Sequence, residues 1–266
     1  MSLSISGKTA IVTGSANGIG LAIARHFIAQ GANVMFADID EHRLEDEVGA
    51  EARTEGSIRM FAGDMRQKLT IANLLSATAD AFERVDILVN ASRQILMSDP
   101  LSVEQDGVET LLQQNLMTSL RMTQMTAKRM IKQAGPDGVA AGSIINLSSI
   151  AATRTQPSLL AYSISCAAVD QMTRSLAVAL APRGIRVNAV AFGSVMSASL
   201  QNSLTDHPDY RDVITAGTPQ RRIAEAAELA ETVQFLASDA AAFMTGQILT
   251  LDGGRSLIDP VNAPAH

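Results

Sequence analysis

Short apolar stretches of strand length alternate along the chain with longer stretches whose apolar residues recur at helical spacing. Strands are predicted at residues 8–14, 33–38, 58–64, 85–90, 143–149, 185–192 and 247–254. Helices are predicted at residues 18–31, 41–56, 69–84, 107–133, 160–181 and 225–237. Strands that alternate with helices in this way are typical of β-α units wound around a parallel sheet, so we predict an α/β fold.

Two segments depart from this rhythm. The stretch GPDGVAAG, residues 135–142, has the composition of a loop. Residues 194–218 lack a strong period and contain HPDY, so we expect them to form a mobile cover over a site. No composition shift divides the remainder, and we therefore predict one domain over residues 1–266.

Composition excludes several classes of partner. The chain has 266 residues, is 47% hydrophobic and carries a net charge of −6, and it has no basic run that could follow a phosphate backbone. No stretch approaches the roughly 20 apolar residues that span a bilayer, so we expect neither nucleic acid nor a membrane as partner. The single cysteine agrees with a cytoplasmic location, and the four histidines lack ligand spacing, so no metal site is predicted.

The stretch TGSANGIG, residues 13–20, lies between the first predicted strand and the first predicted helix. Gly14 permits a tight turn, Gly18 lets the backbone approach a pyrophosphate, and Gly20 lets the helix pack against the sheet. The free N–H groups at the start of the helix favour phosphate. Glycines also punctuate ordinary strand-helix turns, which is the alternative interpretation. We expect cofactor contacts from Gly14, Ser15, Asn17, Gly18, Ile19 and Gly20.

An acidic residue ends the second predicted strand. The Asp38 carboxylate can accept hydrogen bonds from both ribose hydroxyls of a dinucleotide and would repel a phosphate on that ring, so NAD is favoured over NADP. Alternatively, Asp38 is a solvated strand end or caps the helix that starts at Glu41. Asp64, at the end of the third strand, could reach the adenine amino group, although aspartate is also common in turns.

These residues, together with SIINLSS, AYSIS and LTLDGG, resemble the short-chain dehydrogenase/reductase family over nearly the whole chain. The stretch at residues 222–254 is similar to its bacterial members related to ketoacyl-carrier-protein reductases. The resemblance implies a single-domain Rossmann-type, doubly wound parallel sheet of about seven strands flanked by helices. It also implies hydride transfer between nicotinamide and an alcohol or ketone, cofactor contacts at Asn90 and Val195, and a tetramer.

The resemblance also assigns catalytic residues. Ser149 lies thirteen residues before Tyr162, which is the family's spacing; the serine would hold the substrate oxygen and the tyrosine would exchange a proton with it. Asn115 matches the helix asparagine that supports a water in the family's proton relay. Taken singly, each residue also has a structural interpretation, since serine ends strands, tyrosine packs at helix starts and asparagine kinks helices.

Three positions depart from the family pattern. Cys166 stands where YxxxK has its lysine, Arg93 ends NASR where the family has NNAG, and Phe192 precedes Gly193 where PG is usual. A thiol provides no positive charge, so an unassisted tyrosine with a pKa near 10 could donate a proton but would be a poor base. Cys166 could instead be a nucleophile, but no histidine is paired with it and packing on an apolar helix face is the simpler interpretation.

The leading hypothesis is therefore an NAD-dependent oxidoreductase that interconverts a ketone and a secondary alcohol, impaired by the loss of the lysine. The alternative is a catalytically inactive dinucleotide-binding protein that acts as a sensor or partner subunit. A third hypothesis is an assembly scaffold that no longer binds nucleotide.

Substrate and assembly are less constrained. Residues expected on loops at the nicotinamide end suggest an apolar small molecule: Ile95, Leu96, Met97, Phe192, Met196 and Leu200. Arg93 and Arg154 could instead meet a carboxylate or phosphate.

The predicted helices at 107–133 and 160–181 carry more apolar surface than one sheet face can bury, so we expect a homo-oligomer. A tetramer built on four-helix contacts is the prediction, with a dimer as the alternative.

Overall fold

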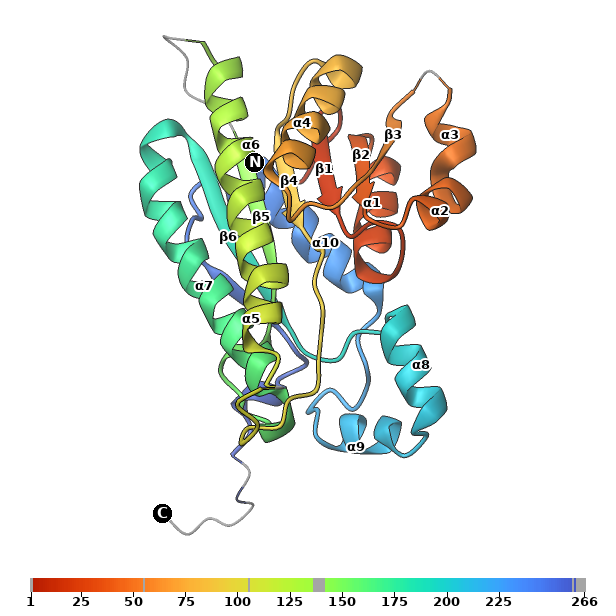
Figure 1. Cartoon of the computed structure of the whole chain (residues 1–266), viewed down its shortest axis with the longest axis vertical. Helices are drawn as coiled ribbons and strands as arrows, with labels where there is room; N and C mark the ends of the chain where they lie inside the picture. Colours follow the sequence, from red (N-terminus) through yellow and green to blue (C-terminus); the bar gives the residue numbers. More distant parts are fainter. Residues whose placement is uncertain (1, 55, 105, 136–141, 260, 262–266) are drawn as a thin grey trace.

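The computed structural model describes residues 2–54, 56–104, 106–135, 142–259 and 261. One parallel sheet of seven strands forms the middle layer, in the order β3-β2-β1-β4-β5-β6-β7 (Figure 1). The strands are β1 (Thr9–Thr13), β2 (Asn33–Asp38), β3 (Ile58–Ala62), β4 (Ile87–Asn90), β5 (Gly142–Ser149), β6 (Ile185–Phe192) and β7 (Ile248–Leu251). The predicted single α/β unit with about seven parallel strands is confirmed.

The direction in which strands are added to the sheet reverses next to β1. Strand β1 pairs with β2 on one side and with β4 on the other, because the chain first adds β2 and β3 on one side of β1 and then adds β4 to β7 on the other. Loops that leave β1 and β4 therefore diverge to opposite sides, which opens a crevice at the carboxyl ends of the strands. The position of the glycine stretch directly after β1 places it in this crevice.

Helices cover both faces of the sheet (Figure 1). The helices outside residues 194–218 are α1 (Gly18–Ala29), α2 (Glu41–Leu44), α3 (Ala50–Ala52), α4 (Lys68–Phe82), α5 (Val108–Leu111), α6 (Thr118–Gln133), α7 (Leu160–Leu180) and α10 (Ala226–Ala237). The period of two in β1 separates the two cores: Ala10 and Val12 pack with α1 and α10, whereas Ile11 packs with α4, α6 and α7.

Two predicted helices contain a π-helical segment. In the predicted helix 107–133, residues Leu112–Met117 are π-helical and join α5 to α6, and in the predicted helix 41–56, Glu45–Gly49 joins α2 to α3. A π segment inserts one extra residue per turn, which rotates the side chains that follow it and is frequent at functional sites. The π segment between α5 and α6 contains Asn115.

The predicted loop at 135–142 lies mostly outside the described residues, and Gly142 already begins β5. Residues 194–218 contain two helices that the hydrophobic pattern did not predict, α8 (Ala198–Asp206) and α9 (Tyr210–Ala216). The Ser197 hydroxyl caps α8 by accepting the N–H of Leu200 at 3.2 Å. Both helices lie at the carboxyl end of the sheet, away from the main layers (Figure 1).

Within the described part of the chain, no helix combines the length and the apolar character needed to cross a bilayer.

Candidate functional site

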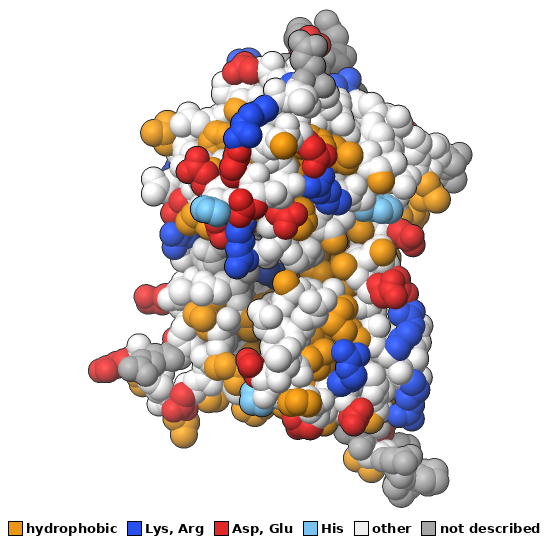
Figure 2. Space-filling model, turned by 90° about the vertical axis from the view of Figure 1, so that its right-hand side faces the viewer, with side chains coloured by type: hydrophobic (Ala, Val, Ile, Leu, Met, Phe, Trp, Pro, Cys, Tyr) orange, Lys and Arg blue, Asp and Glu red, His pale blue; other side chains and the backbone are white. Residues whose placement is uncertain are grey.

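A cleft of about 730 Å³ opens at the carboxyl ends of the strands. The glycine stretch, the end of β2, the loop after β4, the end of β6 and the start of α8 all contribute to its walls. The molecule is hollowed on this face, and hydrophobic side chains show along the hollow, while charged side chains gather above it over α2 and α3 (Figure 2). The cleft is therefore lined by both apolar and polar side chains, and among the charged ones are Asp38, Asp64 and Arg93.

The three glycines of the loop serve different purposes. A Cβ on Gly20 would lie 2.0 Å from the carbonyl oxygen of Gly14, and a Cβ on Gly14 would lie 2.7 Å from the Cα of Ser92, so both positions exclude a side chain by close packing. Gly18 has a φ of +55°, and a Cβ there would meet nothing within 4 Å. Gly18 lines the cleft, so its missing side chain leaves the start of α1 open for a ligand.

The start of α1 suits a phosphate group. Asn17 precedes the helix with an extended backbone, its side chain makes no capping hydrogen bond, and the first turn holds no acidic residue. Backbone N–H groups at a helix start attract anions, and an acidic side chain here would compete with them. Asn17, Gly18, Ile19 and Gly20 line the cleft, so the loop fits the pyrophosphate of a dinucleotide.

Ser15 supports the loop rather than facing the cleft. Its side chain is fully buried, and its hydroxyl accepts the N–H of Ala37 at 2.8 Å, which fastens the loop to β2. Thr13 does the same toward β4, because its hydroxyl accepts the N–H groups of Ala91 and Ser92 at 3.1 and 3.2 Å. These contacts hold the two diverging loops at a fixed separation.

Asp38 lines the cleft beside the glycine loop. Its carboxylate accepts the N–H of Ala16 at 3.0 Å and the N–H of Asp40 at 3.1 Å, which orients the group. The cap of α2 is Asp40, whose side chain accepts the N–H of Arg43, so Asp38 does not cap that helix. Both oxygens of Asp38 retain lone pairs for ribose hydroxyls.

Asp64 also lines the cleft, but its carboxylate is engaged by Arg66 at 2.8 and 2.9 Å. The hydrogen bonds from Arg66 hold the pKa of Asp64 below its usual value. A ligand at this position would therefore contact Asp64 while its carboxylate is paired with Arg66.

Ser149 and Tyr162 come together from the end of β5 and the first turn of α7. Neither of them lines the cleft, but Arg93, which contacts Tyr162, does. Tyr162 is only 3% exposed, and its hydroxyl accepts a hydrogen bond from Nη1 of Arg93 at 2.6 Å. The Arg93 guanidinium carbon lies 4.1 Å from the centroid of the Phe192 ring, and Nη1 also contacts the carbonyl oxygen of Ser148 at 3.3 Å. The arginine thus bridges β5, β6 and α7.

Opposing influences set the acidity of Tyr162. Burial raises its pKa above the ordinary value, and Cys166 adds to this, whereas the charge of Arg93 and a hydrogen bond with Ser149 lower it. The balance remains above the ordinary value, so the phenol is protonated at neutral pH.

Cys166, one turn after Tyr162, is buried among apolar side chains that include Leu111 and Ala161. Burial raises the pKa of its thiol, so the side chain is neutral at neutral pH. This environment is that of a packing cysteine and not of an activated nucleophile.

Asn115 is buried in the π segment, and all of its hydrogen-bonding groups meet protein. Its Oδ1 accepts the N–H of Gln94 at 2.8 Å, and its Nδ2 donates to the carbonyl oxygen of Gln94 and to Ser165 Oγ, each at 3.0 Å. Asn115 therefore clamps the loop that carries Arg93 against α7. Oδ1 accepts one hydrogen bond and has a second lone pair, so the water-supporting role of Asn115 stays a prediction.

Asn90 points into the protein, although the resemblance implied a cofactor contact. Its Nδ2 donates to Asn146 Oδ1 at 2.8 Å and to Thr123 Oγ1 at 3.1 Å, and the residue is buried. Because it is the last residue of β4, the alternation of the strand directs its side chain toward α6. The cleft is lined instead by the residues that follow it, 91–95.

The structure places the predicted substrate-end residues in three kinds of position. Ile95, Phe192 and Leu200 line the cleft, as does Val195, whose backbone bridges to Ala224. Leu96 packs against the buried cluster around Tyr162. The other three do not line the cleft: Met97, which is 71% exposed, Met196 and Arg154.

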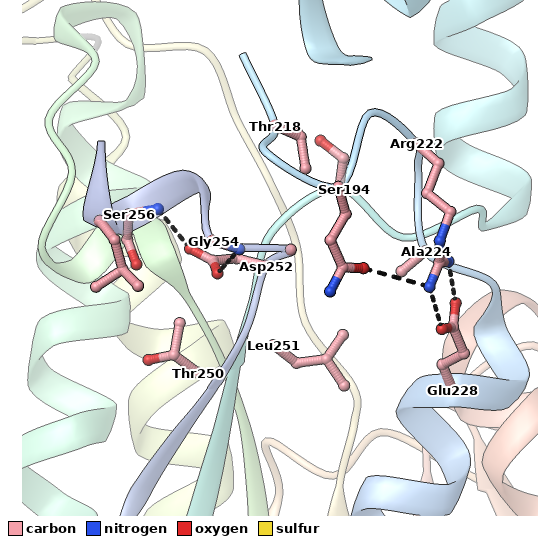
Figure 3. Close-up of a pocket in the computed structure, with 13 residues that line it drawn as sticks. Ser194, Thr218, Arg222, Ala224, Glu228, Thr250, Leu251, Asp252, Gly254 and Ser256 are labelled. Carbon is pink, nitrogen blue, oxygen red and sulfur yellow. Dashed lines mark hydrogen bonds and ion pairs between the residues drawn. The ribbon is translucent and has the colours of Figure 1, made fainter. Parts of the chain in front are cut away.

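A second pocket of about 480 Å³ lies beside β7 and shares Ser194 with the cleft (Figure 3). Its polar groups satisfy one another: the Asp252 carboxylate accepts the N–H groups of Gly254 and Ser256, and Arg222 pairs with Glu228 at 2.6 Å. None of the residues at the Tyr162 end of the cleft lines this pocket. We therefore place the chemistry in the larger cleft.

Among the described residues, no group of three or more His, Cys, Asp or Glu side chains could hold a metal ion. The chemistry available at the Tyr162 end is that of hydroxyl groups and one cation.

The contact between Arg93 and Tyr162 was missed from sequence. The unusual residues at 93, 166 and 192 were visible singly, but nothing local indicates that the arginine side chain spans 69 positions to reach the tyrosine hydroxyl.

Comparison with known proteins finds similar sequences over nearly the whole chain. A family model described as enoyl-(acyl carrier protein) reductase matches residues 14–256. The chain is 30% identical to the 3-oxoacyl-[acyl-carrier-protein] reductase FabG of Thermotoga maritima over 253 residues, which cover 94% of this chain and 98% of that protein. It is 32% identical to the D-threitol dehydrogenase of Mycolicibacterium smegmatis over 253 residues, or 95% of this chain and 94% of that protein.

Solved structures show the same fold. The gluconate 5-dehydrogenase of Burkholderia cenocepacia, in complex with NADP and tartrate, superposes with a TM-score of 0.87 at 26% identity, covering 97% of this chain and 98% of that chain. The structure of gox2181 superposes with a TM-score of 0.86 at 31% identity, covering 96% and 98%.

Proposed function

The chain belongs to the short-chain dehydrogenase/reductase family, and from that premise we propose that it reduces a ketone with NADH and runs the reverse reaction more slowly. One observation carries the proposal. A glycine loop shaped for a dinucleotide lines one cleft together with Arg93, and Arg93 donates a hydrogen bond to the buried, protonated Tyr162. A ligand that spans the cleft from the glycine loop to Arg93 would bring its reactive end next to Tyr162.

The residues fit a nicotinamide dinucleotide. Gly18 and the start of α1 would hold the pyrophosphate, Asp38 would accept from the adenosine ribose, and Phe192 would border the nicotinamide end. When bound, the nicotinamide supplies or accepts the hydride. The protein's own contribution is to orient the two reactants and to manage a proton.

Tyr162 is the proton donor in this proposal. Its hydroxyl gives a proton to the substrate oxygen as a carbonyl becomes an alcohol, and Ser149 holds that oxygen by a hydrogen bond. Burial keeps the phenol protonated at neutral pH, which supports donation and disfavours the opposite transfer. This is the reason for proposing reduction as the faster direction.

NAD is the proposed cofactor rather than NADP. The Asp38 carboxylate lies at the adenosine end and would repel an additional ribose phosphate. The gluconate 5-dehydrogenase with bound NADP shows that a relative of this fold takes the other cofactor. Calorimetric titration with NAD and NADP in parallel tests the preference, and tighter binding of NADP would refute it.

The substrate is proposed to be small and largely uncharged near the reacting carbon. Ile95, Phe192 and Leu200 line that end of the cleft, and Arg93 is already engaged by Tyr162. We further propose that α8 closes over the bound substrate, since Ser197, Leu200 and Ser203 reach the cleft from α8 and its cap.

The function is tested with a panel of ketones and secondary alcohols, assayed with NADH and NAD. Tyr162→Phe removes the proton donor and should abolish turnover while leaving cofactor binding intact. Tyr210→Phe is the matched control, because Tyr210 is the only other tyrosine and is exposed on α9. Turnover that persists unchanged in Tyr162→Phe would refute the proposal.

A non-catalytic dinucleotide-binding protein is the second candidate. The Arg93 side chain stacks on Phe192 at the nicotinamide end, where it narrows the space for a reactive pair. Tight NAD binding without turnover of any substrate in the panel would favour this candidate, and absence of binding would remove both.

We also propose a tetramer, with a dimer as the alternative. On α7, Ile164 is 39% exposed and Val178 is 77% exposed, which leaves an apolar face for a second subunit. Other small or apolar residues of the two long helices are buried within the chain: Met130 on α6, and Ala161 and Ala177 on α7. Light scattering at micromolar concentration tests the proposal, and a persistent monomer would refute it.

A further inference from the structure

The three positions that depart from the family pattern meet at one point in the structure. Arg93 follows β4, Cys166 lies on α7 and Phe192 ends β6. The Arg93 guanidinium is 2.6 Å from the Tyr162 hydroxyl and lies over the Phe192 ring at 4.1 Å, and Cys166 is a neighbour of Tyr162 within one buried cluster. Changes that are far apart in sequence thus meet in one set of contacts that includes Tyr162.

The charge of Arg93 is not taken up by an acidic side chain. No ion pair within the described residues includes Arg93. Its Nη1 meets the phenol oxygen and the carbonyl oxygen of Ser148, both of which are uncharged acceptors. A guanidinium stays protonated at any physiological pH and stacks readily on an aromatic ring, so the Phe192 face can hold it without removing its charge.

The groups facing Tyr162 leave the arginine as the single cation in this cluster. Ser149 from β5 provides a hydroxyl, Cys166 from α7 provides a neutral thiol, and Arg93 comes from the loop after β4. Asp170, two turns after Tyr162, is buried beyond Cys166. Stabilisation of a phenolate at position 162 therefore depends on Arg93.

We propose that Arg93 is the positioning residue for Tyr162: it fixes the hydroxyl and stabilises the phenolate left when the proton passes to the substrate oxygen. The proposal rests on the proposed function, and it assigns to residue 93 the positive charge that the family resemblance would place at residue 166. In the proton transfer, the O–H bond of Tyr162 breaks, a new O–H bond forms on the substrate oxygen, and the negative charge stays beside the guanidinium.

The small side chains around the cluster agree with this assignment. Cys166 belongs to the same buried cluster as Ala161 and Leu111, so the position of the family's lysine carries a neutral side chain in apolar surroundings. The hydroxyl is instead approached from the loop after β4, which Asn115 clamps through Gln94 directly next to Arg93. The loop that carries the cation is thus fixed to the helix that carries the acid.

The test uses Tyr210→Phe as the background, because Tyr162 is then the only tyrosine and the chain has no tryptophan. Ultraviolet absorbance of the phenolate during a pH titration reports the ionisation of Tyr162 alone. Arg93→Met should raise the pKa of Tyr162 by about 1 to 3 pH units, the range for loss of an opposite charge in contact, and Arg93→Lys should raise it less. Arg154→Met is the control and should leave the pKa unchanged, because Arg154 is exposed and does not line the cleft.

A second measurement covers the case in which the fold is lost before Tyr162 ionises. With ring-labelled tyrosine, the chemical shift of the phenol carbon at neutral pH reports the hydrogen bond to its oxygen. The chemical shift of the Tyr162 phenol carbon should change in Arg93→Met, change less in Arg93→Lys and stay the same in Arg154→Met. If neither the pKa nor the chemical shift of Tyr162 changes in Arg93→Met, the proposal is overturned.

These readouts need no substrate, so they separate the two proposals. A pKa that depends on Arg93 in a protein without turnover supports the contact and refutes the proposed reaction. If turnover is found, Arg93→Met should lower kcat by about tenfold or more with a smaller change in KM. Unchanged kcat would overturn the role of Arg93 and leave the reaction standing.

Discussion

The same substitution at two glycines of one loop should have opposite consequences. In Gly20→Ala the new Cβ would lie 2.0 Å from the carbonyl oxygen of Gly14, which belongs to backbone and cannot move aside. Forcing an atom into such a site costs about 3 kcal/mol or more of unfolding free energy. In Gly18→Ala the Cβ meets nothing within 4 Å, and the cost is the strain of a φ of +55° in an alanine, about 1 kcal/mol.

Gly18→Ala should cost little stability and should nevertheless lower the affinity for NAD. The Gly18 Cβ would project into the cleft where the pyrophosphate approaches the start of α1. Loss of one hydrogen bond to a charged phosphate is worth about 1.5–3 kcal/mol, so NAD affinity should fall by roughly ten- to a hundredfold. Gly7→Ala is the matched control: Gly7 has a φ of +74°, a Cβ there also meets nothing within 4 Å, and the residue does not line the cleft.

Thermal unfolding without cofactor and calorimetric titration with NAD measure the two effects. At about 2–4 °C per kcal/mol, Gly20→Ala should lower the Tm by at least about 6 °C, and Gly18→Ala and Gly7→Ala by about 2–4 °C each. NAD affinity should fall in Gly18→Ala and stay unchanged in Gly7→Ala. Equal NAD affinity in those two variants would refute the assignment of the pyrophosphate to this loop, and a stable Gly20→Ala would refute the packing argument.

Three further outcomes are expected. Asp38→Asn, which keeps shape and removes charge, should weaken NAD binding by about tenfold and narrow the preference over NADP; parallel calorimetry that finds the NAD-to-NADP ratio unchanged would refute the repulsion argument. The Arg222 side chain lowers the pKa of Glu228 to about 2, so this partly exposed pair stabilises the fold above about pH 4.5 and loses its effect as pH falls toward 2. Glu228→Gln should lower the unfolding free energy by about 0.5–1 kcal/mol at pH 7, with the difference from the parent vanishing in acid denaturant titrations; a constant difference at all pH values would contradict this. Cys166→Lys should be destabilising by about 3 kcal/mol because it buries a second cation near Arg93, and much of that loss should disappear in the Arg93→Met background; equal losses in both backgrounds in a double-mutant cycle would rule out the charge conflict.

The sequence by itself determined the architecture and one end of the site. The alternation of strand and helix patterns gave all seven strands, because each β-α unit buries its apolar residues through local periodicities of 2 and 3.6. The glycine loop was equally local, since the strand, the turn and the helix start that make it are consecutive. Asp38 followed from its place at the end of the next strand.

The tertiary structure decided what lies beside the reacting tyrosine. The direction of the Asn90 side chain depends on the pleat at the end of β4, and the contact of Arg93 depends on how the loop after β4 crosses toward α7 and β6. The π segment around Asn115 and the helices α8 and α9 also follow from tertiary packing, which the local hydrophobic pattern does not predict. From sequence, the cysteine at position 166 predicted that Tyr162 has no positively charged side chain beside it. In the folded chain a cation reaches Tyr162 from 69 positions away, because contacts between distant segments are set by how whole layers pack and not by the residues next in line.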